Sequence, residues 1–358
     1  MESLKILKKF YKSKKIFITG HTGFKGTWLS IILNYLEAKV YGYALSPKKE
    51  SLFKLTKIKN KISSNTYGDI RNYNKLKKKI KLYKPEIIFH LAAQPLVIES
   101  YEKPVETFHV NTMGTLHLLE SIRNVRTVKS VIIVTTDKVY KIGKKNKRYK
   151  EKDQLGGSDP YSSSKVGAEI VTESYIKSFF EDTKLKNKIS IVRAGNVIGG
   201  GDFSKNRLIP DILKTIKSKK NLKIRNPNHV RPWQHVLDPL VGYLLLAKKQ
   251  HLSKINGEKN NLWNFGPNKN NFKKVIDVVK FVQKLEKFKF SIDNKKKLHE
   301  TAVLKLDSSK AKDKLNWSSK WNLSVALKKT LEWNNSLNKE ISPEKKCVQQ
   351  FLMYMNSK

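Results

Sequence analysis

The sequence has almost no cysteine, few acidic residues and no long hydrophobic run. Cys347 is the only cysteine in 358 residues, which excludes an intrachain disulfide and a cysteine-rich metal site, and we expect no metal. The longest apolar stretches, such as residues 243–247, are far shorter than the ~20 residues that cross a bilayer. The basic start of the chain is followed by an apolar run too short for a signal peptide. These absences predict a cytoplasmic protein without a membrane partner.

Acidic residues number 30 against 73 lysines and arginines, which gives a formal net charge of +43. A charge of this size is typical of proteins that bind nucleic acid. Only eight of the basic residues are arginines, however, and arginine is the better residue for bidentate recognition of phosphate. Lysine occurs in every segment that looks exposed. We therefore interpret the charge as a compositional bias and expect no nucleic-acid partner.

Short apolar runs that favour strands alternate with longer helical patterns. The runs are 14–19, 38–44, 86–92, 128–136 and 188–194. This alternation is typical of βαβ units, and continuous apolar character indicates strands that are covered on both faces. The sequence therefore predicts an α/β fold in which residues 1–194 form a Rossmann-like, doubly wound parallel sheet.

The pattern changes after about residue 195 to shorter elements and loops rich in Asn, Pro and Lys. We expect a smaller C-terminal lobe over residues 195–358, with some segments returning to the first domain. A further strand is expected near 263–268, and helical periodicity is found over 272–286 and 323–335.

Three glycines separate the first expected strand from an expected amphipathic helix. In a dinucleotide-binding loop, Gly20 permits a tight turn, Gly23 leaves room for a pyrophosphate, and Gly26 lets the helix and strand pack closely. The amides of the helix N-terminus then face the anion. An ordinary turn is the alternative. Lys25 either adds charge near the phosphates or faces solvent, and the sequence assigns no role to His21.

The type of dinucleotide stays open. The second strand ends in "YGYALSP", which offers neither an acid for the ribose of NAD nor an arginine for the extra phosphate of NADP. Asp69 follows an expected third strand and either accepts from an adenine amino group or is a simple loop acid.

Tyr161 and Lys165 share one face of a helix that is expected to begin at Asp159 and Pro160. A tyrosine that acts as a base near neutral pH must lose its proton, at a cost of about 4 kcal/mol. One cation ~4 Å away, at an effective dielectric constant of ~20, stabilises the phenolate by about 4 kcal/mol. Lys165 and an oxidised nicotinamide ring can together supply this shift.

Thr136, Asp137 and Lys138 close the run at 128–136. They lie where strands of an open parallel sheet meet their ligands.

Several motifs together make the sequence resemble an extended short-chain dehydrogenase/reductase. They are the glycine loop, "FHLAAQP" at 89–95, "NTMGT" at 111–115, "TTDK" at 135–138 and "PYSSSK" at 160–165. Asp137 directly after Thr136 is similar to the nucleotide-sugar 4,6-dehydratases, whereas sugar epimerases place small residues there. Most of these dehydratases carry Glu after the Asp. Lys138 instead matches the pattern of those that act on CDP-glucose, and the resemblance extends from about residue 14 to about residue 335.

This resemblance implies a lyase that converts CDP-glucose to CDP-4-dehydro-6-deoxyglucose and water. The sugar is transiently oxidised at C4 by NAD, water is lost across C5 and C6, and the hydride returns to C6. By position, Tyr161 takes the C4 hydroxyl proton with Lys165 beside it, Thr136 bonds the C4 oxygen, and Asp137 is the acid. Lys138 is the candidate C5 base, although another group or water stays open for that role. Asp137 has to be protonated and Lys138 neutral.

The resemblance also implies binding residues. Those for the cofactor are Gly20, Thr22, Gly23, Phe24, Gly26, Asp69, Ile70, Leu91, Ala92, Ala93, Asn111, Tyr161 and Lys165. Those for the substrate, mainly on the C-terminal lobe, are Gln94, Asn196, Arg207, Leu208, Ile209, Arg231 and His299. We further expect a homodimer through the helices that follow the active-site strand and carry the tyrosine, and a role in deoxysugar and O-antigen biosynthesis.

Three alternative functions stay open. The chain could be another NAD-dependent nucleotide-sugar dehydratase or a 4-epimerase, a basic nucleic-acid-binding protein on the same fold, or a dinucleotide-binding regulator without activity.

Overall fold

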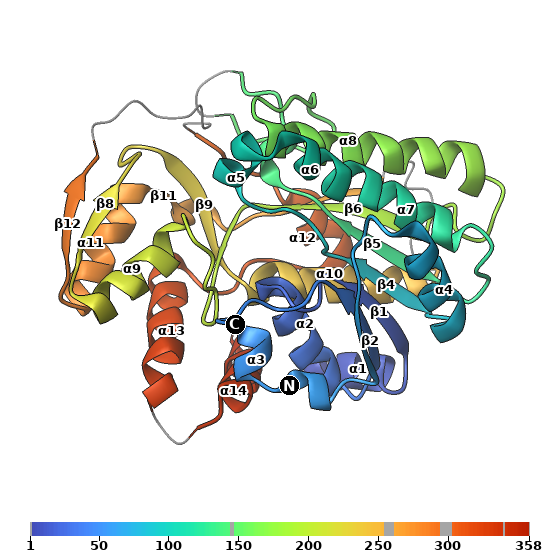
Figure 1. The fold of residues 1–358 in the computed structure, drawn as a ribbon, viewed down its shortest axis with the longest axis horizontal. Helices are drawn as coiled ribbons and strands as arrows, with labels where there is room; N and C mark the ends of the chain where they lie inside the picture. The colour runs from blue at the N-terminus through green and yellow to red at the C-terminus, as the bar shows by residue number, and fades with distance from the viewer. Residues whose placement is uncertain (1, 144–146, 254–260, 294–302, 339–340, 358) are drawn as a thin grey trace.

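A seven-stranded parallel sheet lies at the centre of the computed structural model, which describes residues 2–143, 147–253, 261–293, 303–338 and 341–357 (Figure 1). The strand order is β10-β6-β5-β4-β1-β2-β3, and every neighbouring pair is parallel. The chain thus builds the sheet outward in both directions from β1 and β4, as a doubly wound fold requires. The predicted Rossmann-like architecture is confirmed.

Each apolar run that was expected to be a strand contributes one to this sheet. The strands are β1 (Lys15–Thr19), β2 (Lys39–Ala44), β3 (Ser64–Tyr67), β4 (Ile87–His90), β5 (Ser130–Val134), β6 (Ile189–Ala194) and β10 (Leu262–Phe265). The last of these comes from the C-terminal half of the chain and pairs with β6.

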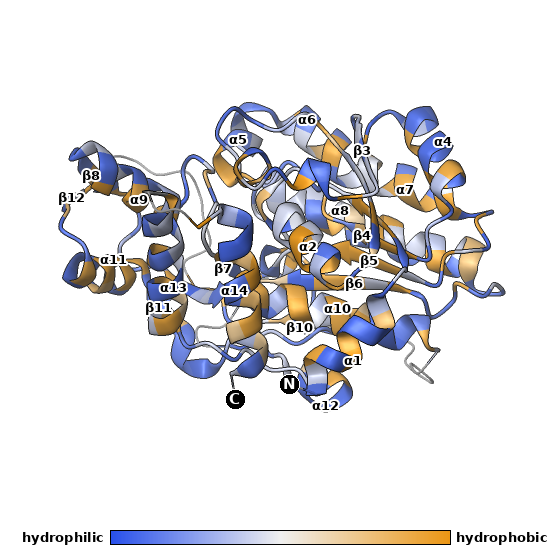
Figure 2. Cartoon of the chain, turned by 90° about the horizontal axis from the view of Figure 1, so that it is seen from below, coloured by the Kyte–Doolittle hydropathy of each residue, from blue (hydrophilic) through white to orange (hydrophobic). Residues whose placement is uncertain are grey.

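Helices cover both faces of the sheet. Ile16 and Ile18 point into one core, whereas Phe17 between them points into the other, because successive side chains of a strand face opposite ways. The first face is covered by α1 (Glu2–Tyr11), α2 (Phe24–Tyr35), α10 (Leu237–His251) and α14 (Pro343–Asn356). The second is covered by α4 (Tyr73–Tyr83), α7 (Gly114–Ile122) and α8 (Pro160–Tyr175). Figure 2 shows hydrophobic residues concentrated on the central strands and on α2.

A smaller group of elements lies beyond β6, on the left of Figure 1. It holds a three-stranded sheet of order β11-β9-β7 and a two-stranded sheet of β12 and β8. These strands are β7 (Asn196–Ile198), β8 (Asn221–Ile224), β9 (Val230–His235), β11 (Phe272–Lys274) and β12 (Lys289–Ile292), and they pack with α9 (Leu208–Ser218), α11 (Val275–Leu285) and α13 (Leu323–Asn335) around a core of their own. The helix expected over 272–286 begins only at residue 275, because residues 272–274 pair with β9.

The remaining elements are short. They are α3 (Leu52–Leu55), α5 (Val97–Glu102), α6 (Pro104–Phe108), α12 (Ser309–Leu315), the π-helical η2 (His109–Met113) and η4 (Ile176–Phe180), and the 3₁₀ turns η1 (Ile58–Asn60), η3 (Asp137–Val139), η5 (Lys269–Asn271) and η6 (Ser336–Asn338). No helix among the described residues is long and apolar enough to span a membrane.

Two features of the N-terminal region differ from the sequence-based expectation. The sequence pattern did not predict α1, whose Leu7 and Tyr11 are fully buried. The pattern did predict an amphipathic helix after the glycine loop, whereas α2 is buried at every position from 26 to 33. The reason is that α3 and α14 pack on the outer side of α2 and exclude water from it as well.

Asp238 joins the C-terminal helix to the body of the molecule. Its Oδ1 accepts hydrogen bonds from the Tyr354 hydroxyl (2.7 Å) and the Lys320 amide (3.1 Å), and its Oδ2 accepts from the His235 amide (3.0 Å). The carboxyl group is fully buried, and burial raises its pKa to about 6 against these hydrogen bonds. The folded protein therefore holds a proton here that the unfolded chain releases at a lower pH.

This raised pKa predicts a stability that depends on pH. Asp238 contributes stability that is present below its unfolded pKa and lost as pH rises through the folded value of about 6. The free energy of unfolding of the wild type should therefore fall relative to that of Asp238→Asn, which cannot ionise, by up to about 3 kcal/mol between about pH 4 and about pH 7. Denaturant titrations across this range measure the difference. The control Asp182→Asn alters an exposed carboxyl group, and a constant gap between Asp238→Asn and wild type would contradict the prediction.

Candidate active site

A cavity of about 870 Å³ opens at the carboxyl ends of β1, β4, β5 and β6. Its wall includes the glycine loop, residues 91–94 after β4, residues 135–138 after β5, and residues 195–199 after β6. It continues outward past Arg231 to β8 and α9. This is the edge of an open parallel sheet at which ligands bind, and the volume suits a small-molecule ligand.

The cavity wall brings together all but two of the site residues that the sequence suggested. They are Gly20, Thr22, Gly23, Phe24, Gly26, Asp69, Ile70, Leu91, Ala92, Ala93, Gln94, Thr136, Asp137, Lys138, Tyr161, Lys165, Asn196, Arg207, Leu208, Ile209 and Arg231. His299 lies outside the described residues. Asn111 is described and does not line the cavity.

Asn111 supports the wall from behind. Its side chain accepts a hydrogen bond from the Gln94 amide (2.9 Å) and donates to the Gln94 carbonyl (3.1 Å) and to Ser164 Oγ (2.9 Å). Gln94 lines the cavity, but its side-chain amide group hydrogen-bonds Leu96 and Thr107. Asn111 therefore connects the loop after β4 to helix α8 through these hydrogen bonds.

The glycine loop leaves room for an anion at the start of α2. Gly20 adopts φ +77°, and a Cβ there would lie 2.6 Å from the Ala92 amide nitrogen. A Cβ on Gly26 would lie 2.1 Å from the Gly20 carbonyl oxygen, so neither position accepts another residue without movement. Gly23 is the N-cap of α2, with no side-chain cap, and it lines the cavity. Free helix N-terminal amides at a concave wall fit the pyrophosphate of a dinucleotide.

Lys25 and His21, which the sequence left open, have different environments. Lys25 lines the cavity, and burial together with the charge of Arg207 lowers its pKa to about 8. His21 is fully buried beneath the loop, where its Nε2 hydrogen-bonds Asn65 Oδ1 at 2.6 Å. Lys25 is therefore part of the site, and His21 supports the loop.

Helix α8 begins as its sequence predicted. Asp159 is the N-cap and accepts from the Ser162 amide at 2.9 Å, and Pro160 is the first helical residue. Tyr161 and Lys165 follow on the cavity side, with 9% and 5% of their surface exposed.

Burial determines the proton affinities of this pair. It raises the pKa of Tyr161 to about 12, against a hydrogen bond from Thr136 and the charge of Arg207. It lowers the pKa of Lys165 to about 7, with the charge of Lys25 acting in the same direction. Lys165 Nζ donates to the Val134 carbonyl oxygen at 3.1 Å, which fixes the amine at the end of β5.

Asp137 lies at the end of β5 with only 2% of its surface exposed. Burial raises the pKa of its carboxyl group, against the charges of Lys138 and Arg231 and a hydrogen bond from Thr136. The Thr136 hydroxyl donates to Asp137 Oδ1 at 3.1 Å, whereas Oδ2 is buried without a hydrogen-bond partner among the described residues. The direction of this pKa shift is the one that an acid in this position needs.

Charged residues that the sequence analysis did not assign complete the wall. Asp202 accepts from Arg207 Nη1 at 3.3 Å and from the Ser204 amide at 3.0 Å, and so orients the guanidinium. Arg225 lines the outer end of the cavity. Both residues lie in the part of the chain, from about residue 14 to about residue 335, over which the family resemblance extends, and their charge was the signal available. The part of the chain that the structure describes has no group of three or more His, Cys, Asp or Glu that could hold a metal.

Comparisons with known proteins agree with this geometry. A family model described as GDP-mannose 4,6 dehydratase matches residues 17–330. A CDP-glucose 4,6-dehydratase of Salmonella typhimurium is 43% identical over 335 residues, which cover 92% of each chain.

Solved structures share the fold at lower identity. UDP-glucose 4-epimerase of Thermotoga maritima with UDP-glucose superposes with a TM-score of 0.77 at 22% identity, over 90% of this chain and 99% of that one. The dTDP-glucose 4,6-dehydratase of Bacillus anthracis in complex with NAD gives 0.73 at 22%, over 92% and 98%. Because the family model and the Salmonella relative both match most of its length, the chain belongs to the nucleotide-sugar 4,6-dehydratase family that this model describes.

Proposed function

We propose that this chain converts CDP-glucose to CDP-4-keto-6-deoxyglucose and water, with NAD as its cofactor. The observation that carries the proposal is the buried Asp137 carboxyl group, which lies in the same cavity as Tyr161 and has one oxygen without a partner among the described residues. A 4-epimerase needs no acid for a leaving hydroxyl group, whereas a dehydratase does. The 43% identity to a CDP-glucose 4,6-dehydratase supports the nucleotide and the sugar.

The residues of the inner cavity fit the cofactor. Gly20, Gly23 and the N-terminus of α2 would hold its pyrophosphate, and Asp69, which the sequence left between an adenine contact and a loop acid, lies on the same wall. The Asp69 carboxylate also accepts two hydrogen bonds from Arg71, from Nε at 3.0 Å and from Nη2 at 2.6 Å. When bound, NAD supplies the acceptor that removes the C4 hydride and returns it at C6.

In the first stage, Tyr161 takes the proton of the C4 hydroxyl group as the hydride leaves C4. Burial opposes this step because it favours the neutral phenol. The Thr136 hydroxyl group donates to Asp137 Oδ1 in this structure; when it turns to Tyr161 it stabilises the phenolate, and the family pattern gives it the C4 oxygen of the bound sugar. Lys165 adds its charge to this end of the cavity when it is protonated.

In the second stage, the 4-keto group acidifies the C5 hydrogen. Lys138, in its neutral form, takes that proton, while Asp137 donates its own proton to the C6 hydroxyl group, which leaves as water. The hydride then returns to C6 and a proton to C5, so no cofactor is consumed. Burial raises the pKa of the Asp137 carboxyl group and so favours the protonated form that this step needs.

The outer cavity suits the nucleotide diphosphate. Arg207 and Arg231 lie on its wall, and arginine is the residue that suits contact with phosphate. Asn196, Leu208 and Ile209 lie beside them. We accordingly propose that residues 1–194 bind NAD and that residues 195–358 mainly bind the substrate, with β10 among the segments that return to the first domain.

Incubation with nucleotide sugars tests the proposed function. We expect CDP-glucose to give a product lighter by one water, with the alkali-induced absorbance of a 4-keto-6-deoxy sugar, and dTDP-glucose and GDP-mannose to react much more slowly. Mass spectrometry of the product measures whether water has been lost. A product of unchanged mass would indicate a 4-epimerase and contradict the proposal.

Two variants separate the proton transfers of the second stage. Asp137→Asn should lower dehydration about 10²- to 10⁴-fold, the usual contribution of a general acid, while reduced nicotinamide still forms. Lys138→Ala should slow the exchange of the C5 hydrogen with solvent deuterium by a similar factor. Absorbance of the reduced cofactor and NMR of the sugar measure these effects. Wild-type exchange in Lys138→Ala would leave the base role to another group or to water.

We also propose a homodimer that forms through α6, η2 and α8. These elements pack together and expose Val105 (69%), Met113 (39%) and Ile170 (57%), apolar side chains that a partner subunit would cover. A cytoplasmic location is part of the proposal, supported by the single, buried Cys347. A role in deoxysugar and O-antigen biosynthesis follows if the product is the 4-keto-6-deoxy sugar.

A charge in this surface tests the dimer. Ile170→Glu should shift the protein from dimer to monomer in sedimentation equilibrium, because a buried carboxylate without a partner opposes association. Leu82→Glu is the matched control, since Leu82 is 64% exposed on α4 and lies outside the proposed contact. A wild-type monomer, or the same mass for both variants, would contradict the proposal.

A further inference from the structure

A buried ion pair lies directly behind the catalytic wall. Arg193 on β6 and Glu169 on α8 are 1% and 0% exposed, and Arg193 binds the carboxylate through Nε to Oε1 (3.0 Å) and Nη2 to Oε2 (2.5 Å). Neither residue lines the cavity. The charge of Glu169 raises the pKa of Arg193 against the effect of burial. The two charges therefore neutralise one another inside the protein.

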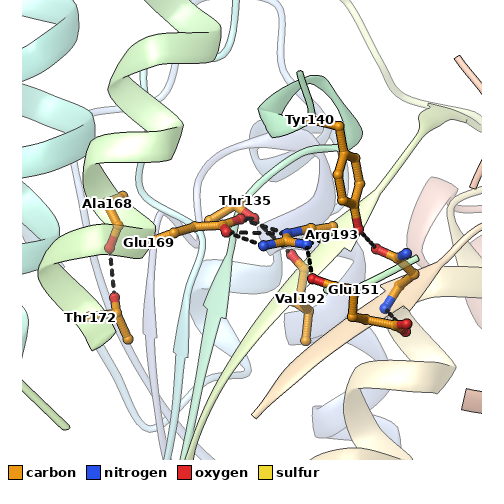
Figure 3. Close-up of polar contacts among 9 residues, drawn as sticks. Thr135, Tyr140, Glu151, Ala168, Glu169, Thr172, Val192 and Arg193 are labelled. Atoms are coloured by element: carbon orange, nitrogen blue, oxygen red, sulfur yellow. Dashed lines mark hydrogen bonds and ion pairs between the residues drawn. The ribbon is translucent and has the colours of Figure 1, made fainter. Parts of the chain in front are cut away.

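This pair binds the chain on both sides of the catalytic segment 136–138 (Figure 3). Before the segment, Thr135 Oγ1 donates to Glu169 Oε1 at 2.6 Å. After it, the Tyr140 hydroxyl accepts from Arg193 Nη1 at 2.8 Å and donates to Asn264 Oδ1 at 2.7 Å. The segment that presents Asp137 and Lys138 is thus attached at each end to one rigid group.

The same pair is fixed to the helix that carries Tyr161 and Lys165. Glu169 follows Lys165 by four residues on α8, so both side chains lie on one face of that helix. Arg193 Nη1 also donates to the Glu151 carbonyl at 2.9 Å, and the Glu151 side chain accepts from the Asn264 amide at 2.9 Å. A buried network in which nearly all donors and acceptors are bonded allows few alternative arrangements.

We propose that Thr135, Glu169, Arg193 and Tyr140 are positioning residues that hold Asp137 and Lys138 in register with Tyr161. The proposal rests on the proposed function, in which two stages use two different elements. Oxidation at C4 needs α8 and, of the segment after β5, only Thr136, whereas elimination needs both Asp137 and Lys138 of that segment at a fixed distance from the same sugar. Loosening the network therefore slows the elimination, in which the C5 proton is removed and Asp137 protonates the leaving C6 hydroxyl group, more than it slows the oxidation.

Thr135→Val tests this proposal, with Thr172→Val as its matched control. Thr172 is also buried, and its hydroxyl donates to the Ala168 carbonyl of its own helix at 2.7 Å, so both variants lose one buried hydroxyl group (Figure 3). We expect Thr135→Val to lower kcat for dehydration about 10- to 100-fold, as small displacements of reacting groups do. The KM for CDP-glucose should stay within about twofold, because uniform binding is not affected. Reduced nicotinamide should accumulate during turnover, since oxidation continues.

Further measurements separate positioning from a loss of structure. Thermal unfolding of the two valine variants should shift by similar amounts, whereas only Thr135→Val loses activity, and Thr135→Ser should restore it because the hydroxyl group returns. Equal turnover in the two valine variants, or an equal fall of oxidation and elimination in Thr135→Val, would overturn the proposal. A wild type that does not dehydrate CDP-glucose would instead refute the proposed function, and the two failures are thereby distinguished.

Discussion

Burial of ionisable groups at the carboxyl edge of the parallel sheet is the constraint on which this site depends. β5 carries Asp137 to that edge and α8 carries Lys165, and both side chains are almost completely buried. Removal from water favours the neutral form of each, so the acid keeps its proton more firmly and the amine releases its own more readily. The same effect raises the pKa of Tyr161. Positive charge near the tyrosine therefore has to offset its burial before it can act as a base.

Two kinds of buried charge stand on the two sides of the cavity wall. On the inner side, Arg193 and Glu169 neutralise each other and satisfy nearly all of their hydrogen-bonding groups. On the cavity side, Asp137 keeps an oxygen without a partner among the described residues, and Lys25 and Arg207 lie close enough to affect one another. The paired charges give a rigid support, whereas the groups on the cavity side, such as Asp137 Oδ2, keep hydrogen-bonding capacity for a ligand. The catalytic wall is thus supported from behind by an ion pair without net charge.

The sequence predicted those elements correctly whose signal lies in residues that are close together in the chain. Strands buried on both faces are continuous apolar runs, so β1, β2, β4, β5 and β6 were predicted near their observed bounds. Asp159 and Pro160 marked the start of α8, because the capping bond is made within one turn. The burial of α2 could not be predicted, since α14, which covers it, lies about three hundred residues further along the chain. Residues 272–274 were misassigned to a helix because their partner, β9, lies about forty residues earlier in the chain, outside the range of a local pattern.

The same distinction applies to the site. The motifs alone predicted which residues lie at the carboxyl edge of the sheet. These are three glycines before a helix, Thr136 and Asp137 after a strand, and Tyr161 four residues before Lys165. Only the tertiary structure decided which charges meet. It turned Lys25 into the cavity, kept Asn111 behind the wall, and placed Glu169 and Arg193 under the catalytic segment. The reason is that residue types are written locally, whereas burial and charge pairing arise between segments that only folding brings together.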